Sequence, residues 1–422
     1  MSLRNRELAN LMVVGLLTAM GFASVYIARQ EVVSTASLSY AGFFFVLYLA
    51  AHLVARLTVP YADPYLLPMA GLLTAVGVTE IYRLDPTDAF RQGLWIVIAL
   101  GAFAGTLLLL HRDYRRLESY KYLLGLGALV LLALPAAPVI GRTINGARLW
   151  VGFGSLQFQP GELAKLLLIA FLAGYLREKR EVLAQGRPKD LGPLLVIWGG
   201  AMLVLVETND LGSALLYFGV FVAMVYVATA RFVYVGLGAA LFAGGAAGAY
   251  KLVPHVRERV DVWLDPWSRI HTEGYQTVQG LYSIGNGGFG GTGLGKGTFT
   301  TTSGGQLIPY ANTDLIFSAL AQELGLIGAA ALLLVFMLFV ARGMRIALVA
   351  QDGFSKLLAV GLTFGFALQT FIIVGGVLRL IPLTGITLPF VSYGGSSVVA
   401  NFVLLAGLLL VSNRANAGAG AR

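Results

Sequence analysis

The stretch TDLIFSALAQELGLIGAAALLLVFMLFVA, residues 313–341, decides the fold because it is apolar over a length that can cross a bilayer. A spanning helix needs about 20 apolar residues, and about twelve segments of the chain meet that need. Hydrophobic residues make up 57% of the 422 residues and charged residues only 12%. The sequence therefore predicts an all-α polytopic integral membrane protein with about twelve transmembrane helices. The expected helices lie near residues 8–28, 39–57, 67–83, 92–111, 120–140, 161–177, 191–208, 211–229, 233–252, 313–341, 355–380 and 387–411.

The orientation follows from the basic residues. Lysine and arginine gather in alternate connecting segments, and the side of the membrane that carries them is expected to be cytoplasmic. Both termini then lie in the cytoplasm, and the first apolar segment is expected to be a retained helix because it is too long for a signal peptide. The same bias accounts for the net charge of +9 without a nucleic-acid partner. The residues are Arg112, Arg115, Arg116, Lys121, Arg177, Lys179, Arg180, Arg187, Lys189, Arg342, Arg345, Lys356, Arg414 and Arg422.

Two long loops are expected on the outer face, near residues 141–160 and 253–312. The second contains FGGTGLGKGT, residues 289–298, with the spacing of a nucleotide-binding P-loop. It lacks the preceding strand, the following helix and the Ser or Thr after the lysine, so the P-loop interpretation fails. Lys296 could still contact a phosphate as a point charge, or it could be a solvated loop lysine. The chain has no cysteine, which excludes disulfides and thiol chemistry.

Several ionisable residues lie at or near the expected outer helix ends. Asp314 could cap the helix that follows it, or it could be a partly desolvated general base at the membrane surface. Glu323 lies further along the same helix, where an ionisable residue marks a functional-site hypothesis. Glu162 and Lys165, spaced i, i+3, form either a local ion pair or part of a binding site. Asp210 is either a cap or a binding residue, and Arg148, Lys165 and Lys296 are candidates for anion contacts.

Six stretches of the chain, in order, carry a family resemblance. They are FRQGLWIVIAL, NGARLWVGFGSLQFQPGELAKL, NDLGSALL, LDPWSRIHTEGYQTVQGLYSIGNGGFGGTGLGKG, IPYANTDLIFSALAQELGLIGA and IPLTGITLPFVSYGGSS. Together they resemble the SEDS family of peptidoglycan glycosyltransferases, the FtsW/RodA group of shape, elongation, division and sporulation proteins. The resemblance spans about residues 67–414. It implies a ten-helix core there and an additional N-terminal two-helix hairpin in residues 1–66. The composition of residues 415–422, ANAGAGAR, predicts a flexible cytoplasmic tail.

The resemblance also implies roles for residues. Asp314 matches the essential aspartate of an HTDFIF-like motif, in which Thr313 precedes it, while Tyr310 and Asn312 replace an acidic residue and a histidine of the family pattern. Arg148 and Trp150 match a GARRW-like element, with Leu149 where arginine is common. Glu162 and Lys165 match an ELAK element. The predicted substrate-binding residues are Arg148, Trp150, Glu162, Lys165, Asp210, Lys296, Thr313, Glu323, Ser392 and Ser396, the last two from the SYGGSS signature.

The implied activity is polymerisation of lipid II on the outer face of the bacterial cytoplasmic membrane, with Asp314 as general base and undecaprenyl pyrophosphate as leaving group. The implied partner is a class B penicillin-binding protein. A bound Mg²⁺ or Mn²⁺ would suit the pyrophosphate, but the sequence contains no all-protein metal cage and requires no cofactor. The alternative is a lipid II flippase. A transporter site is expected near the midplane between internal repeats, whereas the charged residues here gather at one face and no internal repeat is visible.

Overall fold

The structure, a computed structural model, describes residues 2–30, 35–138, 140–144, 147–153, 156–184, 192–299 and 307–419. The helices are α1 (Leu3–Gln30), α2 (Thr35–Thr58), α3 (Leu66–Leu84), α4 (Pro86–Leu110), α5 (Arg116–Ser119), α6 (Lys121–Ala133), α7 (Pro160–Glu178), α8 (Arg180–Ala184), α9 (Gly192–Glu207), α10 (Leu211–Thr229), α11 (Phe232–Leu252), α12 (Pro254–Leu264), α13 (Tyr275–Gly287), α14 (Ile316–Val349), α15 (Gly353–Val377) and α16 (Gly395–Ala419). Short 3₁₀ turns are η1 (Leu134–Ala136) and η3 (Trp267–Arg269).

The predicted helical membrane fold is confirmed. Among the described residues, eight helices are long and apolar enough to cross a membrane, namely Leu3–Ala28, Ser39–Thr58, Pro86–Leu110, Leu211–Thr229, Phe232–Leu252, Ile316–Val349, Gly353–Val377 and Gly395–Gly418. The other four expected segments coincide with α3, α6, α7 and α9, of which α6 and α9 have only 13 and 16 residues. The count of twelve spanning helices therefore stays a prediction.

Helix ends differ from the expected ones at two functionally relevant places. The last helix was expected to begin at residue 387, but α16 begins at Gly395, and residues 378–394 form an irregular segment. Helix α6 ends at Ala133 instead of near residue 140. At the other end of α16, the helix continues to Ala419, so residues 415–419 of the expected tail are helical. The basic residues Arg187, Lys189 and Arg422 lie outside the described residues.

The loop 141–160, expected on the outer face, contains a small sheet that the all-α prediction did not include. Strands β1 (Gly141–Ile144), β2 (Ala147–Phe153) and β3 (Leu156–Phe158) pair antiparallel in that order. The pairing of Arg142 with Trp150 and of Val151 with Phe158 fixes the register. The pairing supplies hydrogen-bond partners for backbone groups of these three short strands.

Aspartate caps begin three of the long helices. Asp85 accepts backbone N–H groups of Thr87 and Asp88 ahead of α4, and Asp352 accepts from Ser355 ahead of α15. Asp210 does the same for α10, through Ser213 N at 3.0 Å. A carboxylate at this position satisfies otherwise unpaired donors and interacts favourably with the helix dipole.

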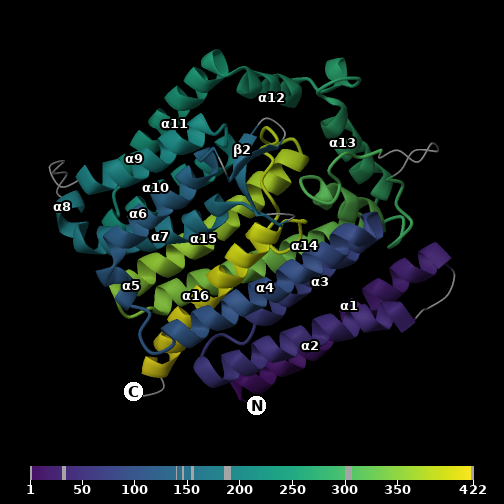
Figure 1. Ribbon diagram of the computed structural model, residues 1–422, viewed down its shortest axis with the longest axis horizontal. Helices are drawn as coiled ribbons and strands as arrows, with labels where there is room; N and C mark the ends of the chain where they lie inside the picture. Colours follow the sequence, from purple (N-terminus) through teal and green to yellow (C-terminus); the bar gives the residue numbers. More distant parts are fainter. Residues whose placement is uncertain are drawn as a thin grey trace.

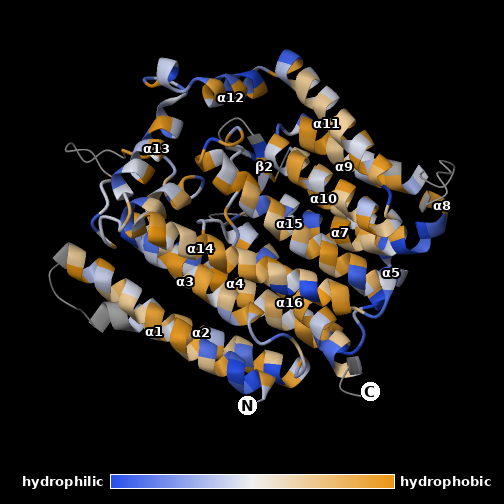
Figure 2. Cartoon of the chain, turned by 180° about the vertical axis from the view of Figure 1, so that it is seen from behind, coloured by the Kyte–Doolittle hydropathy of each residue, from blue (hydrophilic) through white to orange (hydrophobic). Residues whose placement is uncertain are grey.

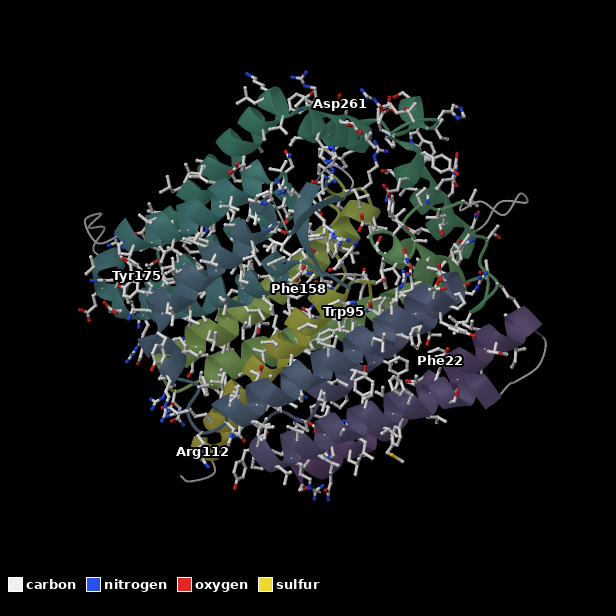
Figure 3. All side chains as sticks on the ribbon, in the orientation of Figure 1. Phe22, Trp95, Arg112, Phe158, Tyr175 and Asp261 are labelled. Carbon is white, nitrogen blue, oxygen red and sulfur yellow. The ribbon has the colours of Figure 1, made fainter. Side chains whose placement is uncertain are left out.

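The long helices pack as a bundle with the two ends of the chain at the same end (Figure 1). Helices α12 and α13 lie at the opposite end, where β2 also reaches. Arg112, in a segment expected to be cytoplasmic, and Asp261 on α12 mark these two ends (Figure 3). Hydrophobic residues cover the long helices, whereas hydrophilic residues concentrate at α12 and in the connections near α5 and α8 (Figure 2).

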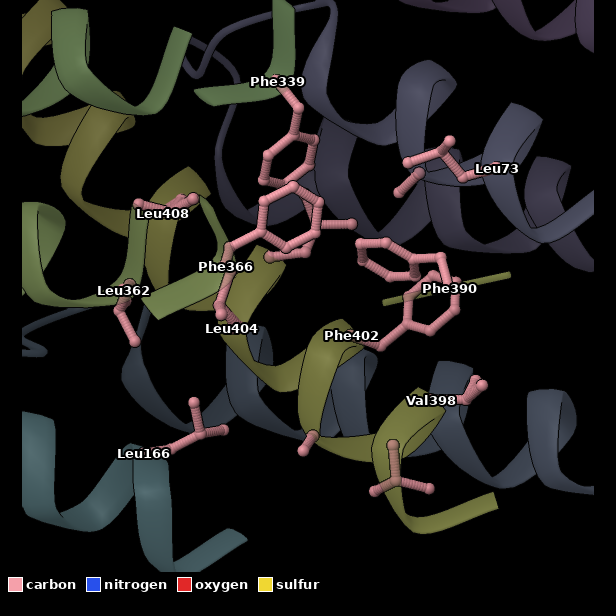
Figure 4. Packing of buried hydrophobic residues seen from close by; sticks show 14 of the residues in the cluster. Leu73, Leu166, Phe339, Leu362, Phe366, Phe390, Val398, Phe402, Leu404 and Leu408 are labelled. Atoms are coloured by element: carbon pink, nitrogen blue, oxygen red, sulfur yellow. The ribbon is translucent and has the colours of Figure 1, made fainter. Parts of the chain in front are cut away.

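Aromatic residues fill the centre of the bundle. Phe366 of α15 packs on Phe339 of α14 with ring centroids 4.3 Å apart. Phe390, from the irregular segment before α16, contacts both Phe366 and Phe402 of α16 (Figure 4). The irregular segment is therefore anchored in the core, which fixes the residues on either side of Phe390.

The N-terminal hairpin of α1 and α2 packs along the outside of α3 and α4 (Figure 1). At its end near the N-terminus it is held by a buried cluster, in which His52 Nδ1 lies 2.7 Å from Glu7 Oε1 and Arg4 contacts both Glu7 and the Ala62 carbonyl. These contacts join α1, α2 and the connection to α3.

Candidate active site

Asp314 lies in a turn just before α14 and does not cap that helix. The first residue outside α14 is Leu315, and no side chain caps it. The capping interpretation of Asp314 is therefore wrong. The turn is held from two directions, because Ser392 Oγ donates to the Thr313 carbonyl at 2.7 Å and Asn312 Nδ2 donates to Asp88 Oδ2 at 2.8 Å. These contacts leave the Asp314 carboxylate pointing into a cavity.

The cavity has a volume of about 160 Å³ and is polar. Its charged residues come from four places, which are α12, the turn before α13, the turn before α14 that carries Asp314, and the segment after α15. Asp314 and Arg259 both lie beside Gly385, whose φ of +76° belongs to the left-handed region. A β-carbon at Gly385 would lie 3.6 Å from both Asp314 Oδ2 and Arg259 Nη2. The lining residues are His255, Glu258, Arg259, Val262, Trp263, Glu273, Gln276, Thr277, Asp314, Gly376, Arg379, Ile381, Leu383 and Gly385.

The two central groups of the cavity influence each other. Burial raises the pKa of Asp314 to about 6, against the opposing effects of the Arg259 charge and a hydrogen bond from Thr313. Burial also lowers the pKa of Arg259, while Asp314 and Asp210 raise it. A carboxyl group with a pKa near neutral can both hold and release a proton at physiological pH, which is what general acid–base catalysis requires.

Helix α12 is fixed over the cavity by reciprocal hydrogen bonds. Trp263 Nε1 donates to the Arg379 carbonyl at 3.0 Å, and Arg379 Nε donates back to the Trp263 carbonyl at 2.6 Å. Arg259 Nη1 donates to the Leu383 carbonyl at 3.2 Å. Sequence reasoning missed Arg259 and Arg379. For Arg259 the signal available was the charged stretch ERVDVWLDPW, residues 258–267, which runs directly into a stretch that carries the family resemblance.

Glu162 and Lys165 form the ion pair that their spacing predicts. Lys165 Nζ lies 2.9 Å from Glu162 Oε2 and 2.7 Å from Gln369 Oε1, and the lysine is only 4% exposed. Gln369 Nε2 in turn donates to the Thr387 carbonyl at 2.9 Å. Asp210 caps α10, and burial raises its pKa. Gln369 thus joins the ion pair to the irregular segment, and the role of Glu162, Lys165 and Asp210 in substrate binding stays a prediction.

Three further predicted binding residues form hydrogen bonds with backbone groups of the chain. Arg148 Nη2 donates to the Ala137 carbonyl at 3.1 Å, which ties β2 to η1. Ser396 Oγ accepts the backbone N–H of Gln159 at 2.7 Å, ahead of α7. Ser392 is 1% exposed and holds the Asp314 turn. Trp150 is half-buried on β2, and Thr313 Oγ1 donates to the Tyr310 carbonyl at 3.3 Å. The contacts of the two serines position neighbouring backbone, and a direct contact with substrate stays a prediction.

The glycine-rich loop docks on a break in α14. Glu323 accepts the backbone N–H groups of Gly295 and Gly297 at 2.6 and 3.0 Å and pairs with Arg83 Nε at 3.2 Å. The helix is interrupted at Gly325, with φ +68° and ψ −171°. Lys296 is exposed. Glu323 thus anchors the loop that carries Lys296. Because its carboxylate is occupied by these contacts, Glu323 does not support the flippase interpretation.

The backbone of that loop and the break in α14 touch directly. A β-carbon on Gly291 would lie 2.2 Å from the Glu323 carbonyl oxygen, and one on Gly325 would lie 2.2 Å from the Gly291 nitrogen. Gly291 also has a positive φ, +80°. Only residues without side chains fit at these two positions.

A metal ion in this cavity would have to take most of its ligands from the substrate. The described residues contain no group of three or more His, Asp or Glu side chains that could hold one. Asp314 with the neighbouring Glu258 and Glu273 could supply at most a partial set of oxygen ligands, beside two arginines. Mg²⁺ binds through one or two carboxylates and substrate phosphates in many sites, so these residues fit an ion brought with pyrophosphate but no dedicated metal cage.

Comparison with known proteins agrees with the resemblance. A family model described as "Cell cycle protein", covering FtsW, RodA and SpoVE, matches residues 56–417. The chain is 41% identical to the peptidoglycan glycosyltransferase RodA of Mycobacterium tuberculosis strain H37Rv over 98% of this chain and 91% of that protein. It is 35% identical to stage V sporulation protein E of Bacillus subtilis over 82% of this chain and 94% of that protein.

Solved structures have the same fold. One, described as showing structural coordination of polymerization and crosslinking by a peptidoglycan synthase complex, has 32% identity and a TM-score of 0.68 over 84% of this chain and 98% of that chain. The crystal structure of Thermus thermophilus rod shape determining protein RodA has 28% identity and a TM-score of 0.56 over 84% and 97% of the respective chains. The chain is a multi-pass membrane enzyme, and it belongs to the FtsW/RodA/SpoVE family of peptidoglycan glycosyltransferases.

Proposed function

We propose that the chain polymerises lipid II into glycan strands at the outer face of the bacterial cytoplasmic membrane. The relatives' names support the reaction class. The observation that carries the mechanism is the cavity in which the Asp314 carboxyl, with a pKa of about 6, faces the Arg259 guanidinium. This cavity lies at the end of the molecule that the basic residues predict to be outside.

Asp314 acts as the general base. Its carboxylate takes the proton of the acceptor sugar hydroxyl while that oxygen forms a bond to the anomeric carbon of the donor. The bond between the anomeric carbon and the pyrophosphate oxygen breaks, and undecaprenyl pyrophosphate leaves with the electron pair. General base catalysis of this kind contributes about 10²- to 10⁴-fold in rate.

Arg259 stabilises the departing pyrophosphate. It is the cation facing Asp314, and Arg379 lines the same cavity. A fixed cation at the position where negative charge develops lowers the barrier without reorganisation, by an amount of several kcal/mol. Arg148 and Lys165 were the cations expected from the sequence. Arg148 donates to the Ala137 carbonyl, and the Lys165 ammonium is buried against Glu162 and Gln369. A divalent ion, where one is bound, would supply further neutralisation of the same charge.

A class B penicillin-binding protein is the proposed partner, because crosslinking must follow polymerisation of the strands. The support is the structural relative described as a complex that coordinates polymerization and crosslinking.

The test is polymerisation of purified lipid II by the full chain in detergent, alone and with its cognate penicillin-binding protein, with Asp314→Asn as the variant. Long glycan strands from the wild type and none from a variant that keeps its melting temperature support the proposal. Equal activity of the two proteins would remove Asp314 from the mechanism. Inactivity of both, combined with movement of labelled lipid II across vesicles, would assign the chain to the flippase class.

A further inference from the structure

A second cavity lies between the N-terminal hairpin and the core. It has a volume of about 430 Å³ and shares no lining residue with the Asp314 cavity. Six of its eleven lining residues are aromatic, none is charged, and its polar groups are three hydroxyls. The lining residues come from α1, α2, α3 and α4 and are Phe22, Ser39, Tyr40, Phe43, Phe44, Val78, Tyr82, Ala89, Phe90, Gly93 and Leu94.

Packed aromatic rings form one wall of the cavity. Phe22 of α1 is 1% exposed and contacts Tyr40 and Tyr82, with centroids 5.8 and 5.7 Å away. It points from the hairpin toward α3 and α4 (Figure 3). Phe43 and Phe90, by contrast, are 45% and 60% exposed on the outer surface of α2 and α4. The cavity therefore has a buried wall at Phe22 and opens between apolar rings on the surface expected to face lipid.

The cavity lies in the half of the membrane expected to be the outer leaflet. Tyr82 is two residues from the end of α3, and Phe90 lies in the second turn of α4, beside the connection between these helices. Asp88, one residue before the cavity-lining Ala89, bonds Asn312 of the turn that carries Asp314. The cavity thus lies at the same end of the bundle as the proposed active site.

The size and chemistry select a hydrocarbon chain. Water does not fill an apolar cavity of this kind, whereas apolar molecules do. A transmembrane helix is about 10 Å wide with a 5.4 Å pitch, so 430 Å³ would hold only about one helical turn. The solvent at this depth is lipid hydrocarbon. We propose that one acyl chain of an outer-leaflet phospholipid occupies the cavity and completes the packing of the hairpin on the core.

The chain offers a matched pair of variants. Gly93 of α4 is buried, yet a β-carbon there meets no atom within 4 Å, so a leucine at this position grows into the cavity. Gly101 of the same helix also has nothing within 4 Å, but it is exposed and does not line the cavity. Gly93→Leu and Gly101→Leu make the same change of helix propensity, and only the first fills the cavity.

The experiment uses the full chain in vesicles of phosphatidylethanolamine and phosphatidylglycerol that contain phosphatidylglycerol with a diazirine in one acyl chain. After irradiation, mass spectrometry locates the adducts. We expect labelling at the buried Phe22 and the half-buried Tyr40, a severalfold loss of it in Gly93→Leu, and no change in Gly101→Leu. Labelling at Leu108 and Leu109, which are 57% and 82% exposed on α4, is the reference for folding and insertion.

Unchanged labelling of Phe22 in Gly93→Leu, with the reference intact, would overturn the proposal. So would labelling of Phe22 by a diazirine-bearing polyprenyl phosphate but not by the phospholipid, because the cavity would then hold the tail of a lipid-linked sugar carrier. Neither outcome depends on the polymerase assay, so this proposal and the proposed function fail separately.

Discussion

Removing the charge of Arg259 should move the pH dependence of the reaction. The Asp314 and Arg259 side chains both lie 3.6 Å from the β-carbon position at Gly385, so their facing atoms are within roughly 7 Å of each other. At that separation and an effective dielectric constant of about 20, the two charges attract by roughly 2 kcal/mol. A positive charge stabilises the carboxylate and lowers its pKa, so in Arg259→Gln the pKa of Asp314 should rise from about 6 by about one to two units.

The assay is the pH dependence of kcat/KM for lipid II polymerisation. A general base must be deprotonated, so the wild-type rate should fall as the pH drops through about 6. In Arg259→Gln this fall should begin at a pH one to two units higher, in addition to a lower plateau rate from the lost stabilisation of pyrophosphate. The control is Arg257→Gln on the same helix, which removes an exposed arginine bonded to the Tyr250 and Lys251 carbonyls.

The reasoning is refuted if Arg259→Gln lowers the rate while the acidic limb stays at the wild-type pH. The limb would then report a group other than Asp314, or the two side chains would not interact in the working enzyme. A shift of equal size in Arg257→Gln would also refute it, because the effect would come from the overall charge of α12.

Three other changes test other parts of the site. Gly385→Ala places a methyl group 3.6 Å from both Asp314 and Arg259, at a residue with positive φ. Polymerisation should be lost while stability, measured as a shift in melting temperature, falls by only about 1–2 kcal/mol. Glu323→Gln removes the carboxylate that anchors the glycine-rich loop. Hydrogen exchange should then rise severalfold in residues 288–299 and stay unchanged in α16. Equal protection of residues 288–299 in variant and wild type would show that the N–H groups of Gly295 and Gly297 need no carboxylate. If a metal ion neutralises pyrophosphate, EDTA should lower the polymerisation rate severalfold and added Mg²⁺ should restore it. An unchanged rate would show that the arginines are sufficient to neutralise the pyrophosphate.

The features that depend on local sequence pattern could be predicted from the sequence. Apolar length located the long helices, and i, i+3 spacing located the Glu162–Lys165 pair. The resemblance located Asp314. Arg259 was missed because its importance comes from α12 folding back over a turn 55 residues later in the chain, which no periodicity reveals. The late start of α16 was missed because residues 387–394 are apolar enough to continue a helix, yet Phe390 is used to anchor an irregular segment in the aromatic core.

The direct contact between Gly291 and Gly325 has a consequence for how the sequence can change. At both positions a side chain would collide with backbone atoms, at 2.2 Å in each case, and not with another side chain. A mutation elsewhere can make room by shortening a neighbouring side chain, but it cannot shorten a carbonyl or an amide. Neither glycine can therefore be rescued by a second-site substitution, and the two positions should tolerate replacement only through a change in the length or path of the loop itself.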